Sequence, residues 1–235
     1  MTAQGQATTS NRILSRLSES DLALLDPYLT RIDLPVRKRL EGSGKPIEYV
    51  YFPESGFASV VADGHGDRGI EVGLIGREGM TGMAVVMGTD RTPNETFIQH
   101  AGVGRRIATA NLRRAIELSR TLHQAFLLYA HAFLTQASYT AMANGRSKIE
   151  ERLARWLLMA QDRVSGNRLN LTHEFLSLML GVRRPGVTVA INLLQKAELI
   201  KASRGVIAII DREGLKRISN GAYGTPEAEF NRLFG

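Results

Sequence analysis

Six polar side chains in the last third of the sequence have types and spacing that suit the binding of phosphate groups and of paired hydrogen-bond acceptors. Arg183 and Arg184 are adjacent, and each guanidinium can donate two parallel hydrogen bonds. Hydroxyl and amide groups follow at Thr188 and Asn192. The full set is Thr172, Arg183, Arg184, Thr188, Asn192 and Arg204. We expect these residues to bind a partner, and we expect no catalytic residues and no enzymatic activity.

The sequence around these residues predicts two short helices joined by a sharp turn. Thr172 is a suitable N-cap for a helix over 173–180, and Gly181 supplies the turn. A second helix is predicted over 184–197, with Pro185 in its first turn, where the missing N–H is tolerated. This spacing is typical of a helix-turn-helix.

A β-hairpin is predicted directly after the second helix. Its strands cover 199–201 and 206–210, and its turn, 203–205, carries Arg204 at the tip. A hairpin in this position is the wing of a winged helix, so we expect the partner to be double-stranded DNA. Thr172, at a helix N-terminus, and Arg204 are expected to contact phosphates, while Arg183, Thr188 and Asn192 are candidates for base or phosphate contacts.

The charge distribution agrees with an anionic partner for the same region. The chain of 235 residues has 30 Lys and Arg against 23 Asp and Glu, a formal charge of +7. Residues 1–145 have 15 basic against 14 acidic residues, whereas residues 146–235 have 15 against 9. A concentrated basic field favours phosphate binding, although a solvated basic surface is the alternative explanation.

The sequence has few residues that could form disulfides, metal sites or haem sites. The absence of cysteine excludes disulfides, cysteine-ligated zinc, iron–sulfur clusters and thiol nucleophiles. Haem or metal binding is considered at four histidines, but structural or solvated roles are favoured, so we predict no metal and no cofactor. These histidines are His65, His100, His123 and His131.

The first 110 residues predict a helix followed by a β-roll. The helix is placed within 11–34, with Ser18 or Ser20 as its cap and Pro27 or Pro35 near its end. Short β-prone runs follow at 49–52, 58–61, 70–75 and 96–99. Glycines recur at positions 73, 76, 79 and 82 without a phosphate-loop context, and we assign them to tight turns that need a positive φ.

One long helix is predicted over 111–144, with apolar residues on two faces. The first face has heptad spacing: Leu122, Phe126, Tyr129, Phe133, Gln136, Thr140 and Ala143. The second comprises Ala125, Leu128, Ala132, Thr135, Tyr139 and Met142. Packing against the roll on one face and a twin helix on the other predicts a homodimer. Burial inside a monomer is the alternative.

A domain boundary is predicted near residue 145. Asn144 and Gly145 suit a helix end, and Ser147 with Glu150 forms a candidate capping box for the next helix. The predicted parts are 1–110, a helix and sensor β-roll; 111–145, the dimerisation helix; and 146–235, the winged-helix domain.

This order of elements resembles the Crp/Fnr family of bacterial transcription regulators, and the match is most specific over 171–200. The resemblance implies an α+β fold: an N-terminal cyclic-nucleotide-binding-type, jelly-roll-like β-roll, a long dimerisation helix and a C-terminal winged helix-turn-helix. It also implies that Arg184 reads guanine through O6 and N7. Pro185 and Val189 stand where the family's catabolite activator has charged residues that read bases. We therefore expect the DNA half-site bound by each subunit to differ from that of the catabolite activator.

The expected nucleotide pocket departs from the family pattern. Cyclic-AMP receptors use a Gly-Glu pair for the ribose and an Arg-Ser pair for the phosphate, where this chain has 81–84, with Met83, and 92–95, with Asn94 and Glu95. Met83 cannot accept hydrogen bonds as a carboxylate does, and Glu95 would repel a phosphate. Cyclic AMP is therefore not the expected effector.

The resulting hypothesis is a homodimeric regulator that binds palindromic promoter sites and senses an unidentified small effector, with RNA polymerase as a further expected partner. No signal peptide and no membrane span are found in the sequence, so a cytoplasmic location is expected. One alternative is a winged helix that binds RNA or protein without an effector. A cupin-like metalloenzyme is less favoured because no His-x-His pair with a following Glu occurs.

Overall fold

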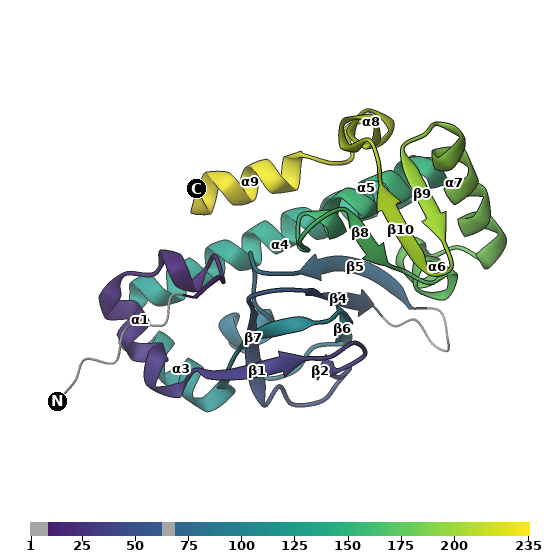
Figure 1. The fold of residues 1–235 in the computed structure, drawn as a ribbon. Coiled ribbons are helices and arrows are strands. Elements are labelled where there is room, and N and C mark those ends of the chain that lie inside the picture. The colour runs from purple at the N-terminus through teal and green to yellow at the C-terminus, as the bar shows by residue number, and fades with distance from the viewer. Residues whose placement is uncertain (1–8, 63–68) are drawn as a thin grey trace.

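The computed structural model describes residues 9–62 and 69–235, and it confirms the predicted α+β fold class. The N-terminal part is a roll of two antiparallel sheets, ordered β1-β7-β3 and β2-β6-β4-β5. The strands are β1 (Thr30–Leu34), β2 (Arg39–Glu41), β3 (Tyr49–Pro53), β4 (Phe57–Ala62), β5 (Ile70–Ile75), β6 (Asn94–His100) and β7 (Gly102–Ala108), with the short helix α2 (Met83–Val86) after β5. Figure 1 shows the roll packed beneath the long helix α4 (Arg120–Arg146).

The N-terminal helical segment is shorter than predicted. It consists of η1 (Leu14–Arg16), α1 (Glu19–Leu25) and η2 (Asp26–Tyr28), and residues 30–34 form β1 instead of continuing the helix. Ser18 caps α1, because its hydroxyl accepts a hydrogen bond from the Asp21 N–H at 3.1 Å. Pro27 lacks the N–H that a longer helix would need, and the chain then pairs with β7.

The predicted single long helix is two helices, α3 (Thr109–Leu118) and α4. Ser119 separates them with an extended backbone, and its hydroxyl accepts from the Leu122 N–H at 3.2 Å to cap α4. The Asp21 carboxylate accepts from the hydroxyls of Ser119 and Thr121 at 2.5 and 2.9 Å. This cluster fixes the start of α4 against α1.

The predicted heptad seam of α4 faces the interior of the chain rather than a second subunit. All of its residues except Phe133 are buried, and Gln136 bonds both the N–H and the carbonyl of Leu74 in β5, at 2.6 and 3.2 Å. On the second predicted face, Ala132 is buried in one core with Phe230 of α9 (Thr225–Phe234). The heptad seam is therefore the face that packs on the roll, whereas the second face is covered only in part, with Ala132 buried and Met142 39% exposed. The homodimer stays a prediction.

A third face of α4 is largely exposed, with Ala130 and Ala137 half-buried and its other residues exposed. It carries Leu127, Ala130, Leu134, Ala137 and Ala141, whose spacing of three and four residues is that of a coiled-coil seam. Leu127 is 41% exposed and Leu134 is 63% exposed. This stripe is the surface that α4 leaves free of the roll and of α9.

The recurring glycines serve close packing more than turns. Among the four, only Gly82 has a positive φ, 75°. A Cβ on Gly73 in β5 would lie 2.8 Å from the Phe133 ring, and one on Gly79 would overlap the Tyr129 hydroxyl. The positive-φ prediction was wrong for the other three, which let α4 and Arg163 approach the backbone.

We expect Gly79→Ala to lower the free energy of unfolding by about 1–3 kcal/mol, because the added methyl forces Tyr129 and α4 away from the roll. Urea unfolding followed by circular dichroism measures this. Gly145→Ala is the control, since nothing lies within 4 Å of its added Cβ and Ala favours the helix. Equal midpoints for the two variants would contradict the packing role of Gly79.

The C-terminal part contains α5 (Ile149–Gln161), β8 (Arg168–Asn170), α6 (His173–Leu180), α7 (Arg184–Lys196), β9 (Ile200–Ser203), β10 (Val206–Ile209), α8 (Arg212–Ile218) and α9. The strands form one sheet, β8-β10-β9. The predicted capping box of Ser147 and Glu150 is replaced by a single hydrogen bond one residue later, in which the Lys148 N–H donates to the Glu151 carboxylate at 3.0 Å. The Lys148 side chain cannot complete the box because its ammonium group has no acceptor. Figure 1 shows α9 running back along α4.

The roll and the C-terminal part share one hydrophobic core. Phe57 and Leu74 of the roll belong to the same buried cluster as Trp156 of α5 and Leu176 of α6. Trp156 donates from Nε1 to Oε1 of the buried Glu71 carboxyl group at 2.6 Å, and burial raises the pKa of Glu71 to about 8. Polar contacts and an apolar surface therefore join the two parts directly, in addition to the covalent link.

Candidate nucleic-acid interface

Local sequence signals build the helix-turn-helix at its predicted position. The Thr172 hydroxyl accepts from the Phe175 N–H at 3.2 Å and starts α6. Gly181 ends α6 with φ 58°, a left-handed conformation that glycine adopts without strain. Pro185 lies in the first turn of α7. The two helices pack through buried residues: Leu176, Leu180, Val187 and Ile191.

The outward face of α7 carries the predicted binding residues. Arg183, Arg184, Thr188 and Asn192 are all exposed. Arg184 lies 3.7 Å from Glu174 of α6, with both side chains at least 70% exposed, so this pair is weak and its guanidinium is available to a partner. Along this face the Thr188 hydroxyl donates to the Arg184 carbonyl at 3.2 Å.

Two apolar side chains share this outward face and were not predicted as binding residues. Val189 is 53% exposed and Leu193 is 43% exposed. Apolar side chains at a major groove contact the thymine methyl. Helical spacing places Val189 and Leu193 on the same face of α7 as Arg184 and Thr188. This spacing is the sequence signal that could have identified them.

The wing brings the remaining residues to α7. Arg204 and Gly205 form the tip between β9 and β10, with φ values of 27° and 79°. A groove of about 210 Å³ separates the wing from α7 and is lined by His173, Thr188, Asn192, Gln195 and Arg204 among others. The structure thus brings Thr188, Asn192 and Arg204 to one groove, whereas Thr172, Arg183 and Arg184 lie outside its lining. His173, at the start of α6, was not predicted here.

The segment of the roll that departs from the cyclic-AMP pattern is bonded internally. The Gly82 N–H and the Thr96 hydroxyl donate to the two oxygens of Glu41, at 2.7 and 2.5 Å. Burial raises the pKa of Glu41 above its usual value. Glu95 forms an ion pair with Arg39 at 3.4 Å. A carboxylate therefore already occupies the space beside Gly82.

The histidines considered for haem or metal have other contacts. His123 Nε2 lies 2.9 Å from the Val86 carbonyl, and His131 pairs with Glu229 of α9 at 3.1 Å. His100 stacks on Phe57, and His65 lies outside the described residues. Across residues 9–62 and 69–235, no three His, Cys, Asp or Glu side chains come together as a metal site. In the same ranges, no helix has the length and apolar character to cross a membrane.

The fold and the site define a winged-helix protein with an N-terminal β-roll, and the comparisons with known proteins agree. Residues 151–218 match the family model of the Crp-like helix-turn-helix domain. No curated protein matches the sequence. The chain therefore carries a Crp-like helix-turn-helix domain and has the fold of Crp/Fnr transcriptional regulators, as the resemblance predicted.

Three solved structures illustrate the similarity over nearly their whole lengths. A protein described as a Crp/Fnr-family transcriptional regulator from Eubacterium rectale ATCC 33656 is 16% identical, with a TM-score of 0.71 over 87% of this chain and 96% of that one. FixK2 from Bradyrhizobium japonicum is 17% identical, with a TM-score of 0.69 over 81% and 96%. The c-di-GMP responsive global regulator CLP of Xanthomonas campestris is 17% identical, with a TM-score of 0.67 over 83% and 100%.

Proposed function

We propose that the chain is a homodimeric transcriptional regulator that binds palindromic DNA sites through α7 and its wing. The observation that carries this proposal is the exposed polar face of α7 beside the wing tip. A recognition helix needs such a face to reach base edges in the major groove, and a basic wing suits the adjacent phosphates. Such a protein acts in the cytoplasm, and contact with RNA polymerase is a further expectation.

The residues divide into two roles in this proposal. Arg184, at the first turn of α7, donates to O6 and N7 of a guanine, while Arg183, Thr188 and Asn192 contact neighbouring bases or phosphates. Thr172, at the N-terminus of α6, and Arg204, at the wing tip, bind phosphates. Val189 and Leu193 supply the apolar part of the contact.

Arg184→Ala should weaken binding to the preferred site by about 1–3 kcal/mol and relax the preference at one base pair. The reason is the loss of two directional hydrogen bonds to one base. Arg204→Ala should lower the affinity for all DNA sequences by the same factor and reduce the dependence of that affinity on salt concentration, because it removes a phosphate contact. Fluorescence anisotropy with a set of single-base-pair variants, at two salt concentrations, measures both effects.

The preferred site is obtained first by binding genomic fragments at two salt concentrations and sequencing the retained pool. Arg31→Gln, an exposed change on β1, is the control and should leave DNA affinity unchanged. An unenriched pool would overturn sequence-specific DNA binding and favour an RNA or protein partner. An equal loss of affinity for every DNA sequence in the Arg184→Ala variant would overturn the base-reading role of Arg184.

The dimer is proposed to form through the exposed stripe of α4. Leu127, Ala130, Leu134, Ala137 and Ala141 form a seam of small and medium apolar side chains along one helix, which suits close packing of two identical helices. A two-fold axis along this seam presents two copies of α7 to half-sites about one DNA turn apart. The roll is proposed to sense a small effector other than cyclic AMP, since Glu41 already bonds Gly82 where a nucleotide would lie.

A further inference from the structure

A cavity of about 490 Å³ lies where four parts of the chain meet. Its walls come from the turn after β5, the middle of α4, the end of α5 and helix α9, with Arg12 of the N-terminal segment at one side. Among the described residues, its lining includes neither 81–84 nor 92–95, where the cyclic-nucleotide receptors of this fold hold their ligand. The cavity is therefore separate from that region of the roll.

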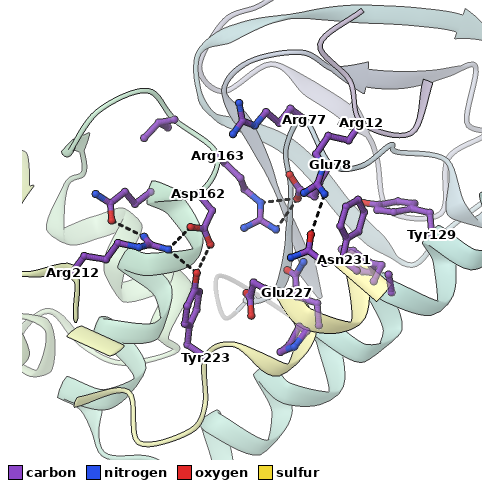
Figure 2. Close-up of a pocket in the computed structure, with 17 residues that line it drawn as sticks. Arg12, Arg77, Glu78, Tyr129, Asp162, Arg163, Arg212, Tyr223, Glu227 and Asn231 are labelled. Carbon is purple, nitrogen blue, oxygen red and sulfur yellow. Dashed lines mark hydrogen bonds and ion pairs between the residues drawn. The ribbon is translucent and has the colours of Figure 1, made fainter. Parts of the chain in front are cut away.

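One end of the cavity carries three guanidinium groups and one carboxylate. Arg163 pairs with Glu78 at 2.7 Å, which leaves Arg12 and Arg77 (Figure 2). The Arg12 N–H donates to the Arg77 carbonyl at 2.7 Å, so these two residues start from adjacent points of the backbone. The main chain therefore places the two arginines next to each other at this end of the cavity.

Neither Arg12 nor Arg77 has a carboxylate partner within ion-pair distance among the described residues. The Arg12 guanidinium donates to the Asn231 amide oxygen at 3.0 Å and lies over the Phe230 ring at 4.6 Å. Arg77 is exposed and makes no side-chain hydrogen bond in the same part of the chain. Burial lowers the pKa of Arg12, and the neighbouring charges of Arg16 and Arg77 lower it further, against the opposing effect of Glu78. An anion placed here would relieve this repulsion.

The rest of the cavity is apolar, neutral or paired, apart from the Glu227 carboxylate of α9 (Figure 2), which accepts from the Gly224 N–H at 2.9 Å and has no ion-pair partner among the described residues. Ala132 and Phe133 of α4 and Phe230 of α9 form an apolar wall. On the facing wall, the Asp162 carboxylate accepts from Arg212 and from the Tyr223 hydroxyl, at 2.6 and 2.7 Å (Figure 2). The occupant therefore needs an apolar body and one anionic end.

We propose that this cavity binds a small carboxylate with a flat apolar body, its carboxylate between Arg12 and Arg77 and its body against Phe133 and Phe230. The volume lies in the usual range of small-molecule sites. Because the walls belong to the roll, α4, α5 and α9, one occupant contacts both the sensor part and the DNA-binding part. The role of this carboxylate as an effector rests on the function proposed above, whereas the binding of the carboxylate in the cavity does not.

The first test compares two aromatic probes of equal size, 2-naphthoate and its neutral amide, 2-naphthamide. Isothermal titration calorimetry on the full chain should give an affinity at least about tenfold higher for the naphthoate, because only this probe pairs with guanidinium groups. Equal affinities would overturn the anionic end, and the absence of binding by either probe would overturn the site.

The second test locates the binding. Arg77→Gln removes one charge from an exposed side chain and should lower the naphthoate affinity about tenfold, without changing the affinity for the amide or the melting temperature. Arg31→Gln, an exposed change elsewhere on the roll, is the matched control. Unchanged naphthoate affinity in Arg77→Gln would overturn the assignment.

A third measurement separates this proposal from the function proposed above. The DNA affinity of the wild-type chain, measured without any probe, tests the regulator alone and does not bear on naphthoate binding. Arg77→Gln should keep that DNA affinity, because Arg77 lies on the turn after β5 and α7 is not part of the cavity.

Discussion

Leu134→Glu should convert the proposed dimer to a monomer and lower the affinity for a two-half-site DNA by about 100-fold or more, because each monomer then binds a single half-site. Leu134 lies in the middle of the exposed stripe of α4 and is 63% exposed within one chain. The substitution therefore leaves the fold of the chain intact but places two facing carboxylates in the seam, where unpaired charges are strongly unfavourable. Sedimentation equilibrium and DNA binding by anisotropy measure the two effects.

Met87→Glu provides the matched control, because Met87 has the same 63% exposure but lies at the end of α2 and is not one of the stripe residues. This variant should remain dimeric and bind DNA as the wild type does. A dimer that persists in Leu134→Glu, with unchanged DNA affinity, would place the subunit contact on another surface.

Glu71→Gln should stabilise the protein increasingly as the pH rises above about 5, and by roughly 4–5 kcal/mol at pH 9. Burial between the roll and α5 raises the pKa of Glu71 from 4.5 to about 8, and one of its oxygens, Oε2, has no hydrogen-bond partner. The folded chain therefore keeps this carboxyl protonated at neutral pH and must bury a charge when the pH is higher. Glutamine keeps the acceptor for Trp156 without that charge.

The sign of the effect follows from the two pKa values. Between about pH 4.5 and 8 the folded wild type binds a proton that the unfolded chain has released, so its free energy of unfolding falls as the pH rises. Thermal unfolding of the wild type and the variant at pH 5, 7 and 9 measures the growing difference. Glu117→Gln, at an exposed position of α3, should show no such growth. A constant difference between wild type and Glu71→Gln at all three pH values would contradict a buried, protonated Glu71.

The helix-turn-helix could be predicted from the sequence because its limits depend on local chemistry. Thr172 caps α6 through its own side chain, Gly181 supplies the left-handed turn, and Pro185 fits only the first turn of a helix. These preferences act within a few residues of each other. The predicted limits of α6 and the predicted start of α7 are confirmed.

The faces of α4 could not be assigned in the same way. Leu122, Phe126 and Leu134 are all strongly apolar, and helical spacing shows only that Leu134 lies on a different face from the other two. Which face is buried depends on the roll and on α9, and α9 is more than 70 residues further along the chain than α4. For the same reason the cavity was not predicted, because its residues meet only after the chain has folded back.

Strand β7 was missed for a different reason. Its sequence contains two glycines and the charged pair Arg105 and Arg106, which reads as a polar loop. It pairs with β1 on one side and β3 on the other, so main-chain hydrogen bonds hold it. Arg105 bonds Glu54 at 3.1 Å, and Arg106 lies over the Tyr49 ring at 4.4 Å, which satisfies both charges.

Helix α9 ties the end of the chain back to its beginning, through the contacts of Arg12 with Asn231 and Phe230. The C-terminal part is therefore held in three places: at the α4–α5 junction near Ser147, through the core that it shares with the roll, and again through α9. A body held at two points can still turn about the line between them, but a third contact off that line removes this freedom. Any turn of α7 relative to the roll must therefore break the shared core or undock α9.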